Sequence, residues 1–347
     1  MRILIEAHHP AHIHFWKYPI REMQRLGHRV RLIGRDRDVM KRLLEVYDWI
    51  EAVIPPRRQT RNRFPFLEML QRQYLVAREI QRFRPDVVAS LMGSYTQSAK
   101  LFGVRNVIFT DSEFQHFNHR IAHPFADAIY TPECFCKELG HKQIRYQGIH
   151  EMMFLRKGVF DPDPSVLKRY GDLVPGEFII LRISAWNTLH DIGARGIGDE
   201  LERFIDSVQG KYRIVASVEE SAITRDLGID LINPQPEDFH SLLYYARLVL
   251  TEGASTASEA GCLAVPTVYV NSTGDRGYLR MLQAKHDIVH CYSASREGLV
   301  GAVDWLNSIE GINWNARETF QSQLSRDLPD GSGFVVNSLL GNSRIGI

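Results

Sequence analysis

Residues 246–260 read ARLVLTEGASTASEA. Positions 248–250 are a short apolar run bounded by turn residues, which predicts a buried parallel strand. The small residues from Gly253 onward predict a tight turn, and Ser255 or Thr256 can cap the helix that follows. Such a unit directs free backbone N–H groups and the positive end of the helix dipole to one point. That point suits a phosphate, and Glu259, about one turn further along, is within reach of a sugar hydroxyl attached to it.

Taken alone, this pattern also fits an ordinary strand–turn–helix connection of an α/β protein. Residues 253–260, however, resemble the donor-nucleotide motif of the GT-B glycosyltransferases, notably the N-acetylglucosaminyl transferase of peptidoglycan lipid-intermediate synthesis. They are also similar to the non-hydrolysing UDP-N-acetylglucosamine 2-epimerases, which share the fold. The resemblance implies that Glu259 accepts hydrogen bonds from the ribose diol of a UDP-sugar. It also implies that four small residues hold the diphosphate: Gly253, Ala254, Ser255 and Thr256.

The length of the chain, 347 residues, exceeds the size at which one hydrophobic core usually stops growing, so we expect two domains. Apolar residues make up 44% and charged residues 24%, with a formal net charge of +1, as in a soluble globular protein. This balance gives no argument for nucleic acid as a partner. The sequence contains no apolar run that could span a bilayer and no signal-peptide pattern. We therefore expect a cytoplasmic protein with at most peripheral contact with the inner face of the membrane.

Short apolar runs and helical patterns alternate along the chain. Strands are expected at 2–7, 29–34, 87–91, 107–110, 128–130, 178–183, 213–217, 248–250 and 266–270. Helices are expected at 13–26, after Thr131-Pro132, at 201–208, around 241–245 and over much of 294–340, where Trp305 and Trp314 are expected to pack. This alternation predicts parallel sheets with helices on both faces.

A break in the alternation falls between Gly148 and Pro164, where Gly and Pro interrupt the pattern. We expect an N-terminal Rossmann-like, acceptor-side domain over 1–150 and a C-terminal nucleotide-sugar-binding domain over 164–330. Residues 331–347 are expected to form a tail that packs back on the N-terminal domain. With the resemblance, the expected fold class is α/β and GT-B-like, with two doubly wound domains facing a central cleft.

Four histidines lie within residues 7–15, AHHPAHIHF, between the first strand and the first helix. This loop belongs to the carboxyl edge of a doubly wound sheet, where ligands bind. The histidines are open to three interpretations: a metal site that needs ligands from elsewhere, a catalytic group, or helix-capping side chains. The resemblance favours His12 as catalytic, because the glycosyltransferases have a Gly-rich loop here that ends in a His. This chain departs from them in carrying His8, His9 and Pro10 where glycines would be.

Motifs along the chain also resemble a little-characterised family of archaeal and bacterial predicted glycosyltransferases. The resemblance covers nearly the whole chain. It rests on Pro10 to Phe15, Arg35-Asp36, Asp111-Ser112-Glu113, Asn118, Pro124 to Asp127, Thr131-Pro132 and Tyr146-Gln147-Gly148.

Asp111 and Glu113 follow the strand at 107–110, and their spacing by two would project both to one side. Burial there would raise their pKa values and suit them to acid–base catalysis. The position resembles one at which the epimerases keep a catalytic Glu. The alternative is a helix-capping Asp and a solvated Glu.

Further candidates follow other strands. Arg182 and Ser184 end the first strand of the second domain, where they can contact a diphosphate or a base. In related transferases the loop at 271–278 contacts the donor sugar, which makes Asp275 and Arg276 candidates. The arginines at 57, 58, 61 and 63 are interpreted as a solvated loop or as a binding surface for an anionic acceptor or lipid head group.

The sequence thus predicts a glycosyltransferase that uses a UDP-sugar, with an unknown acceptor that is anionic or lipid-linked. The nucleotide-sugar is a substrate, and neither a resident cofactor nor a metal is expected. The four scattered cysteines are expected to be reduced thiols. Two alternatives stay open: an epimerase with Asp111 and Glu113 as acid–base groups, and a nucleotide-sugar-binding protein without turnover.

Overall fold

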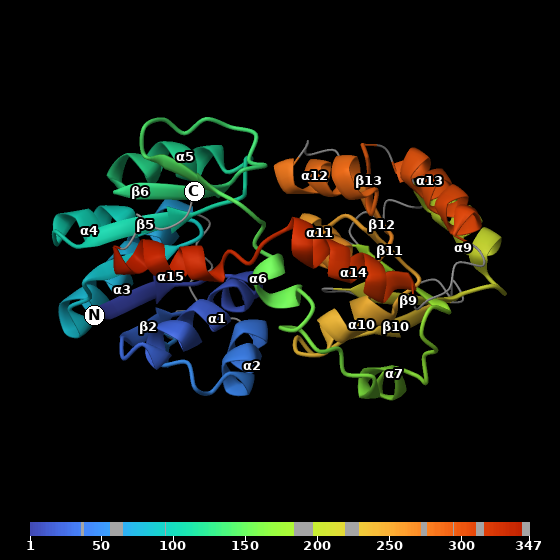
Figure 1. The fold of residues 1–347 in the computed structure, drawn as a ribbon, viewed down its shortest axis with the longest axis horizontal. Coiled ribbons are helices and arrows are strands. Elements are labelled where there is room, and N and C mark those ends of the chain that lie inside the picture. The colour runs from blue at the N-terminus through green and yellow to red at the C-terminus, as the bar shows by residue number, and fades with distance from the viewer. Residues whose placement is uncertain are drawn as a thin grey trace. The chain divides into compact units, whose positions relative to one another are not determined.

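The computed structural model describes residues 1–35, 38–55, 65–93, 95–183, 197–218, 229–271, 276–293, 295–309 and 316–341. The chain divides into two compact units, each built on a parallel sheet (Figure 1). Unit 1 comprises Met1–Phe154 together with Leu328–Ile347, and unit 2 comprises Leu155–Asp327. The C-terminal end of the chain therefore belongs to the same unit as the N-terminal end.

The sheet of unit 1 has the order β3-β2-β1-β4-β5-β6-β7, and every pair of neighbours is parallel. The strand order reverses between β1 and β4, and such a switch point opens a crevice at the carboxyl ends of the strands. The strands are β1 (Arg2–Glu6), β2 (Arg29–Ile33), β3 (Ala52–Val53), β4 (Val87–Ser90), β5 (Arg105–Phe109), β6 (Ala128–Pro132) and β7 (Gln143–Tyr146).

Both faces of this sheet are buried, as parallel strands require. Leu4 and Val88 pack with Val76 and Ile80 of one helix, and their sequence neighbours on the opposite face are also fully buried. The helices of unit 1 are α1 (Pro10–Arg25), α2 (Asp38–Val46), α3 (Pro65–Phe83), α4 (Thr96–Leu101), α5 (His116–Ile121), α6 (Met152–Leu155) and α15 (Ser332–Leu340), with a 3-10 turn at His123–Phe125.

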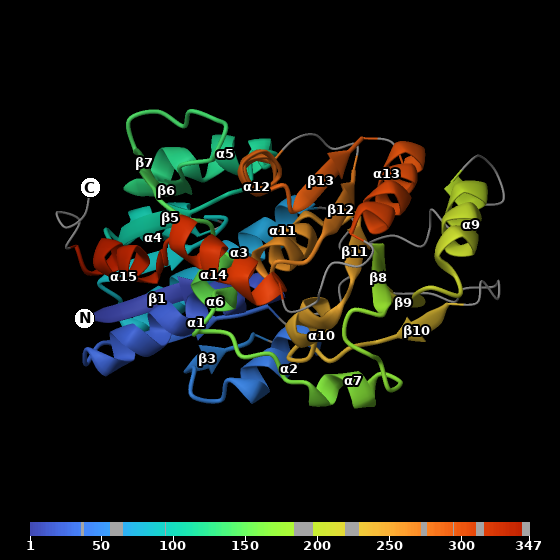
Figure 2. The ribbon, with the colours of Figure 1, turned by 45° about the vertical axis from the view of Figure 1, so that its right-hand side comes forward.

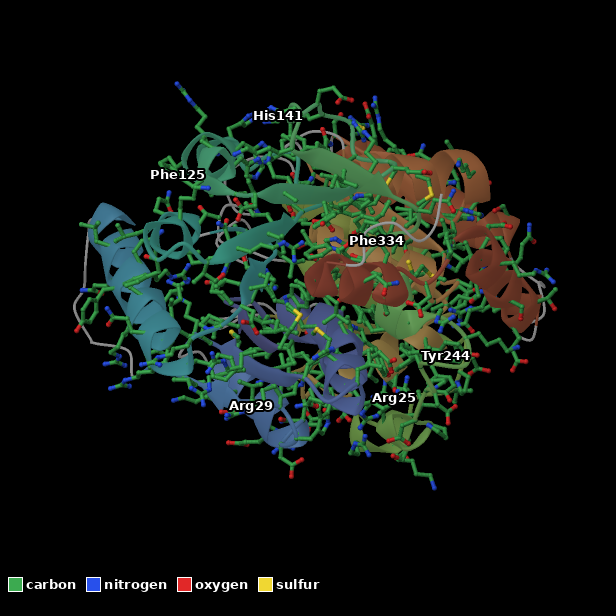
Figure 3. The ribbon with its side chains drawn as sticks, turned by 60° about the vertical axis from the view of Figure 1, so that its left-hand side comes forward. Arg25, Arg29, Phe125, His141, Tyr244 and Phe334 are labelled. Atoms are coloured by element: carbon green, nitrogen blue, oxygen red, sulfur yellow. The ribbon has the colours of Figure 1, made fainter. Side chains whose placement is uncertain are left out.

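Helix α15 packs beside α1 (Figures 1 and 2). The Arg105 guanidinium of β5 donates to the backbone carbonyls of Ser338 and Leu339 at 2.7 and 2.9 Å. Phe334 (labelled in Figure 3) stacks on Tyr146 with ring centroids 5.0 Å apart. The last described helix is thus part of the core of unit 1.

Unit 2 repeats the topology with the parallel order β10-β9-β8-β11-β12-β13, and its switch point lies between β8 and β11. The strands are β8 (Phe178–Ile183), β9 (Arg213–Val218), β10 (Asp230–Ile232), β11 (Leu248–Thr251), β12 (Thr267–Val270) and β13 (Val289–Tyr292). The helices are α7 (Ser165–Arg169), α9 (Ile197–Val208), α10 (Phe239–Tyr245), α11 (Ala254–Cys262), α12 (Gly277–His286), α13 (Ser295–Ser308) and α14 (Ala316–Asp327).

One face of this sheet forms a core with α9 and α13, against which Trp305 packs; Trp314 lies outside the described residues. The nine expected strands are present to within a few residues, whereas β3, β7, β10 and β13 were not expected from the sequence. The helix expected after Thr131-Pro132 is wrong, because β6 continues to Pro132 and a turn follows at Glu133. A proline at the end of a strand sacrifices little of the hydrogen-bond ladder. Helix α1 begins at Pro10, earlier than expected, because proline suits the first turn.

Helix α11 lies close to its neighbours because its residues are small. A Cβ atom at Gly261 would lie 2.7 Å from Val289 Cγ2 and 3.2 Å from Leu282 Cδ1, and both of these side chains are fully buried. Glycine at this position therefore allows the helix to approach β13 and α12.

We expect Gly261→Ala to destabilise the protein by about 1–3 kcal/mol, because overpacking a rigid core exceeds the gain in helix propensity. Gly333→Ala is the matched control, since its Cβ would meet no atom within 4 Å; it should be neutral or stabilise by up to ~1 kcal/mol. Chemical denaturation of both variants checks this, and equal stabilities would contradict the packing described here.

Candidate functional site

In unit 2, the turn between β11 and α11 lies at the switch point. The Glu252 N–H donates to the carbonyl of Arg182 at 3.1 Å, and the Gly253 N–H donates to Thr251 Oγ1 at 3.0 Å. Gly253 is the N-cap of α11 and provides no side chain to cap it, and the first turn contains no acidic residue. The backbone N–H groups that begin this helix, at Ala254, Ser255 and Thr256, therefore lack an intrahelical acceptor. Ser255 is exposed, whereas the Thr256 side chain is largely buried.

Glu259, one turn into α11, is paired with a residue that the sequence motifs did not include. His240 Nε2 lies 3.2 Å from Glu259 Oε1, with the side chains only 7% and 9% exposed. Where the carboxylate is ionised it can only accept, and the imidazole is then the group that can donate to it. Burial of a carboxylate is tolerated where it is hydrogen-bonded. His240 belongs to α10, which packs on α11.

Arg182 is the second-to-last residue of β8 and lies at the same edge of the sheet. Its guanidinium donates to Ser217 Oγ at 2.7 Å and lies over the Phe239 ring at 5.4 Å. Phe239 and His240 are consecutive residues, so the start of α10 contacts both Arg182 and Glu259. Arg276 donates to the Tyr269 hydroxyl at 2.7 Å. Several other candidates lie outside the described residues: Ser184, Asp275 and the arginines at 57, 58, 61 and 63.

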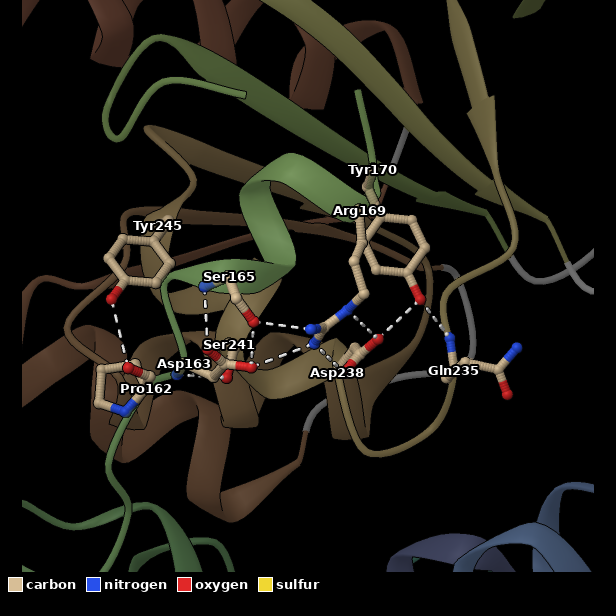
Figure 4. A network of polar contacts seen from close by, with 9 residues as sticks. All are labelled: Pro162, Asp163, Ser165, Arg169, Tyr170, Gln235, Asp238, Ser241 and Tyr245. Carbon is tan, nitrogen blue, oxygen red and sulfur yellow. Dashed lines mark hydrogen bonds and ion pairs between the residues drawn. The ribbon is translucent and has the colours of Figure 1, made fainter. Parts of the chain in front are cut away.

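A polar network holds the start of α10 in place (Figure 4). Arg169 Nη2 donates to Asp238 Oδ1 at 2.7 Å, and the Tyr170 hydroxyl donates to Asp238 Oδ2 at 2.9 Å. The backbone N–H of Asp163 donates to Ser241 Oγ at 3.0 Å. Asp238 immediately precedes Phe239, so the network fixes the residue from which α10 begins.

In unit 1, the histidines after β1 are arranged as a cluster. His8 Nδ1 lies 3.2 Å from Glu6 Oε1, and the His8 and His12 rings are 4.5 Å apart. Burial, followed by the nearby His8, His9, His150 and Arg72, lowers the pKa of His12 well below its ordinary value. His12 is therefore neutral at physiological pH. The helix-capping alternative applies to His9, whose side chain accepts from the Ala11 N–H.

Asp111 and Glu113 have different surroundings. His150 Nδ1 lies 3.1 Å from Asp111 Oδ2, and the His150 side chain is only 6% exposed. Burial raises the pKa of Asp111, but the charge and hydrogen bond of His150 outweigh it and leave that pKa lowered, opposite to the expectation from burial alone. Glu113 is buried, and its Oε1 accepts from the Cys136 N–H at 3.2 Å.

His150, which the sequence motifs did not include, therefore interacts with two of the predicted catalytic residues, Asp111 and His12. His150 pairs with Asp111 and contributes to the lowered pKa of His12. Within the described part of the chain, His150 Nε2 and His12 Nδ1 are buried without a hydrogen-bond partner. The one signal for His150 in the sequence is its place two residues after Tyr146-Gln147-Gly148.

Two features are absent from the described residues. These residues contain no group of three or more His, Cys, Asp and Glu side chains arranged to hold a metal ion. Among them there is also no helix with the length and apolar character needed to cross a membrane.

Comparisons with known proteins agree with this architecture. The family model described as "Protein of unknown function (DUF354)" matches residues 1–295. An uncharacterized protein of Methanocaldococcus jannaschii is 23% identical over 304 residues, which cover 83% of this chain and 87% of that protein.

Solved structures share the fold at low identity. The M. jannaschii UDP-GlcNAc 2-epimerase in complex with UDP-GlcNAc and UDP has a TM-score of 0.72 at 13% identity, covering 99% of this chain and 100% of that chain. S. aureus MnaA with UDP has a TM-score of 0.70 at 14% identity, covering 99% and 97%. The spinosyn rhamnosyltransferase SpnG complexed with thymidine diphosphate has a TM-score of 0.61 at 15% identity, covering 96% and 99%. The predicted GT-B-like fold with two doubly wound α/β domains is confirmed.

We expect Asp111→Asn to lower the pKa of His150. Burial lowers that pKa, but the charge and hydrogen bond of Asp111 outweigh it and leave it raised. The pair therefore stabilises the fold fully between the ordinary pKa values of 3.8 and 6.5. The stabilisation is lost as pH rises through the raised pKa of His150 or falls through the lowered pKa of Asp111.

NMR titration of the imidazole protons and denaturation at several pH values check this expectation. The stability difference from the unaltered protein should be about 3 kcal/mol inside the window and shrink toward alkaline pH. Ser112→Ala is the control, because it removes only a 3.2 Å hydrogen bond to Asp111 Oδ1. A His150 pKa that is the same in Asp111→Asn as in the unaltered protein would refute the coupling.

Proposed function

We propose that this chain, which belongs to the DUF354 family, is a glycosyltransferase. Its proposed donor is a nucleotide-diphosphate sugar, and UDP is the first nucleotide to test. The observation that carries the proposal is the uncapped start of α11 at the switch point of unit 2, with the Glu259 carboxylate one turn behind it. Solved proteins of the same fold, crystallised with UDP or thymidine diphosphate, support it.

In this proposal the diphosphate binds the N–H groups of Ala254, Ser255 and Thr256, where the helix dipole favours negative charge. Gly253 leaves the start of the helix open because it has no side chain. A helix rises about 1.5 Å per residue, so Glu259 lies at a distance suited to the ribose hydroxyls. Arg182 adds positive charge at the same edge, and Ser184 and Asp275 are proposed as further contacts to the donor.

Catalysis is assigned to unit 1. His12 is proposed as the group that accepts a proton from an acceptor hydroxyl, because burial lowers its pKa and so keeps the imidazole neutral, with a ring nitrogen able to accept. Buried His150 and the partly buried Asp111 form a pair that can hold or release a proton. The start of α11 and Arg182 stabilise the charge that develops on the leaving diphosphate. The nucleotide-sugar is the substrate, and the reaction as proposed uses no resident cofactor.

A second candidate function is epimerisation of a UDP-sugar, without an acceptor. The observation that favours it is a set of ionisable side chains in unit 1: buried Glu113 and His150, and the partly buried Asp111 that pairs with His150. Several fold neighbours are UDP-GlcNAc 2-epimerases. In this alternative Asp111 and Glu113 are the acid–base groups.

Nucleotide binding is tested by thermal shift with UDP-, GDP-, dTDP- and CMP-sugars, since a ligand that binds only the folded state raises the melting temperature. Glu259→Ala should weaken UDP binding by roughly 1–3 kcal/mol through the loss of charge-assisted hydrogen bonds. If the dissociation constant for UDP stays the same, the assignment of Glu259 is wrong.

Gly253→Asp separates ligand binding from stability. An Asp caps a helix at least as well as Gly, so the melting temperature should hold or rise, while the carboxylate competes with the diphosphate and weakens UDP binding by roughly tenfold or more. Gly253→Ala is the control, because its Cβ would make only ordinary contacts of 3.5 and 3.6 Å with Thr251 and Thr256. Undiminished UDP affinity in Gly253→Asp would place the diphosphate elsewhere.

The reaction is tested by incubating the protein with UDP-N-acetylglucosamine alone and following the sugar by NMR. A transferase gives at most slow hydrolysis, whereas an epimerase forms UDP-N-acetylmannosamine. Epimerisation would therefore overturn the transferase assignment. Binding without turnover, even with an acceptor extract, would instead identify a nucleotide-sugar-binding protein.

A further inference from the structure

Among the described residues, one side chain forms an ion pair with the carboxylate of Glu259. That partner is His240, whose Nε2 lies 3.2 Å from Oε1. An ionised carboxylate has about four lone-pair sites on its two oxygens, so this one pair leaves Oε2 for other donors. Both side chains are more than nine-tenths buried. A carboxylate in such surroundings is costly when its lone pairs are unsatisfied. The arrangement therefore leaves acceptor capacity for a hydroxyl-bearing ligand.

His240 is itself held rigidly. The Phe160 ring packs edge-on against its ring with centroids 6.2 Å apart. Two residues before it, Asp238 accepts from Arg169 and Tyr170, and one residue after it, Ser241 accepts from the Asp163 N–H (Figure 4). A donor fixed in this way restricts the orientation of the carboxylate it contacts.

We propose that His240 is a positioning residue that makes the nucleotide site select ribose over 2′-deoxyribose. The inference rests on the proposed function, because it requires the diphosphate at the start of α11. Ribose offers two neighbouring hydroxyl donors, which can satisfy the remaining lone pairs of Glu259. A 2′-deoxyribose offers one donor and leaves part of the acceptor capacity of this largely buried side chain unused. Sites built to bond a hydroxyl discriminate strongly against analogues that lack it.

The experiment is calorimetric titration with UDP and 2′-deoxy-UDP. The unaltered protein should bind UDP more tightly by roughly 10- to 100-fold. His240→Phe keeps a ring of similar shape but removes the donor, so the preference should fall to within about threefold while UDP binding weakens roughly tenfold. His240→Gln should retain most of the preference, because its amide can donate at about the reach of Nε2.

Two further variants make the test robust. His240→Asn carries an amide too short to replace Nε2, so it should lose the preference as His240→Phe does and serves if the latter does not fold. His290→Gln is the matched control, since His290 contacts Asp287 at 2.8 Å in a more exposed histidine–carboxylate pair of the same unit. It should leave both dissociation constants unchanged.

The outcomes separate the two claims. If the unaltered protein binds UDP but does not distinguish it from 2′-deoxy-UDP, the inference is wrong and the proposed function stands. The inference also fails if His240→Phe keeps the full preference, or if Gln is as poor as Asn. If UDP does not bind, the same titrations use GDP and 2′-deoxy-GDP. If neither ribonucleotide binds but dTDP does, the inference is wrong and the proposed function stands; absence of binding to all three overturns the proposed function itself.

Discussion

Parallel pairing of every described strand in both sheets is the constraint on which the rest of the structure depends. Parallel strands are covered on both faces, so their side chains are apolar and the polar chemistry is displaced to the loops at their carboxyl ends. In unit 1 these loops carry the histidines after β1 and the acidic residues after β5. In unit 2 the start of α11 follows β11, and Arg182 lies near the carboxyl end of β8. One topology, used twice, therefore produces two polar edges with different chemistry.

The strands could be predicted where burial on both faces requires consecutive apolar residues, as at 87–91 and 178–183. The prediction failed where the same residues are compatible with two kinds of secondary structure. Thr131-Pro132 is compatible with a helix start and with the end of a strand, and the chain uses the second. Strand β7 has no apolar run because it is the last strand of its sheet and only Tyr146 is fully buried there. Edge strands of this kind leave little trace in the sequence.

The candidate site was predictable to the extent that it follows strand ends. Gly253, Glu259, Arg182, His12 and Asp111 were all proposed from that rule and from family resemblance. Their partners His150 and His240 were not, because each pairs through space with a residue of another element. The local sequence around a histidine in a loop or a helix does not predict which carboxylate it will pair with. Its effect on that carboxylate's charge and orientation is a property of the folded state alone.

The return of the chain to unit 1 affects the order in which the two units can fold during translation. Helix α15 packs on α1, and Arg105 in the middle of the sheet is tied to its last turn. A ribosome that has completed β7 must still synthesise all of unit 2 before this helix emerges. Unit 2 is continuous in sequence and can complete itself first. The half of the protein that is translated earliest is thus the one whose core closes last.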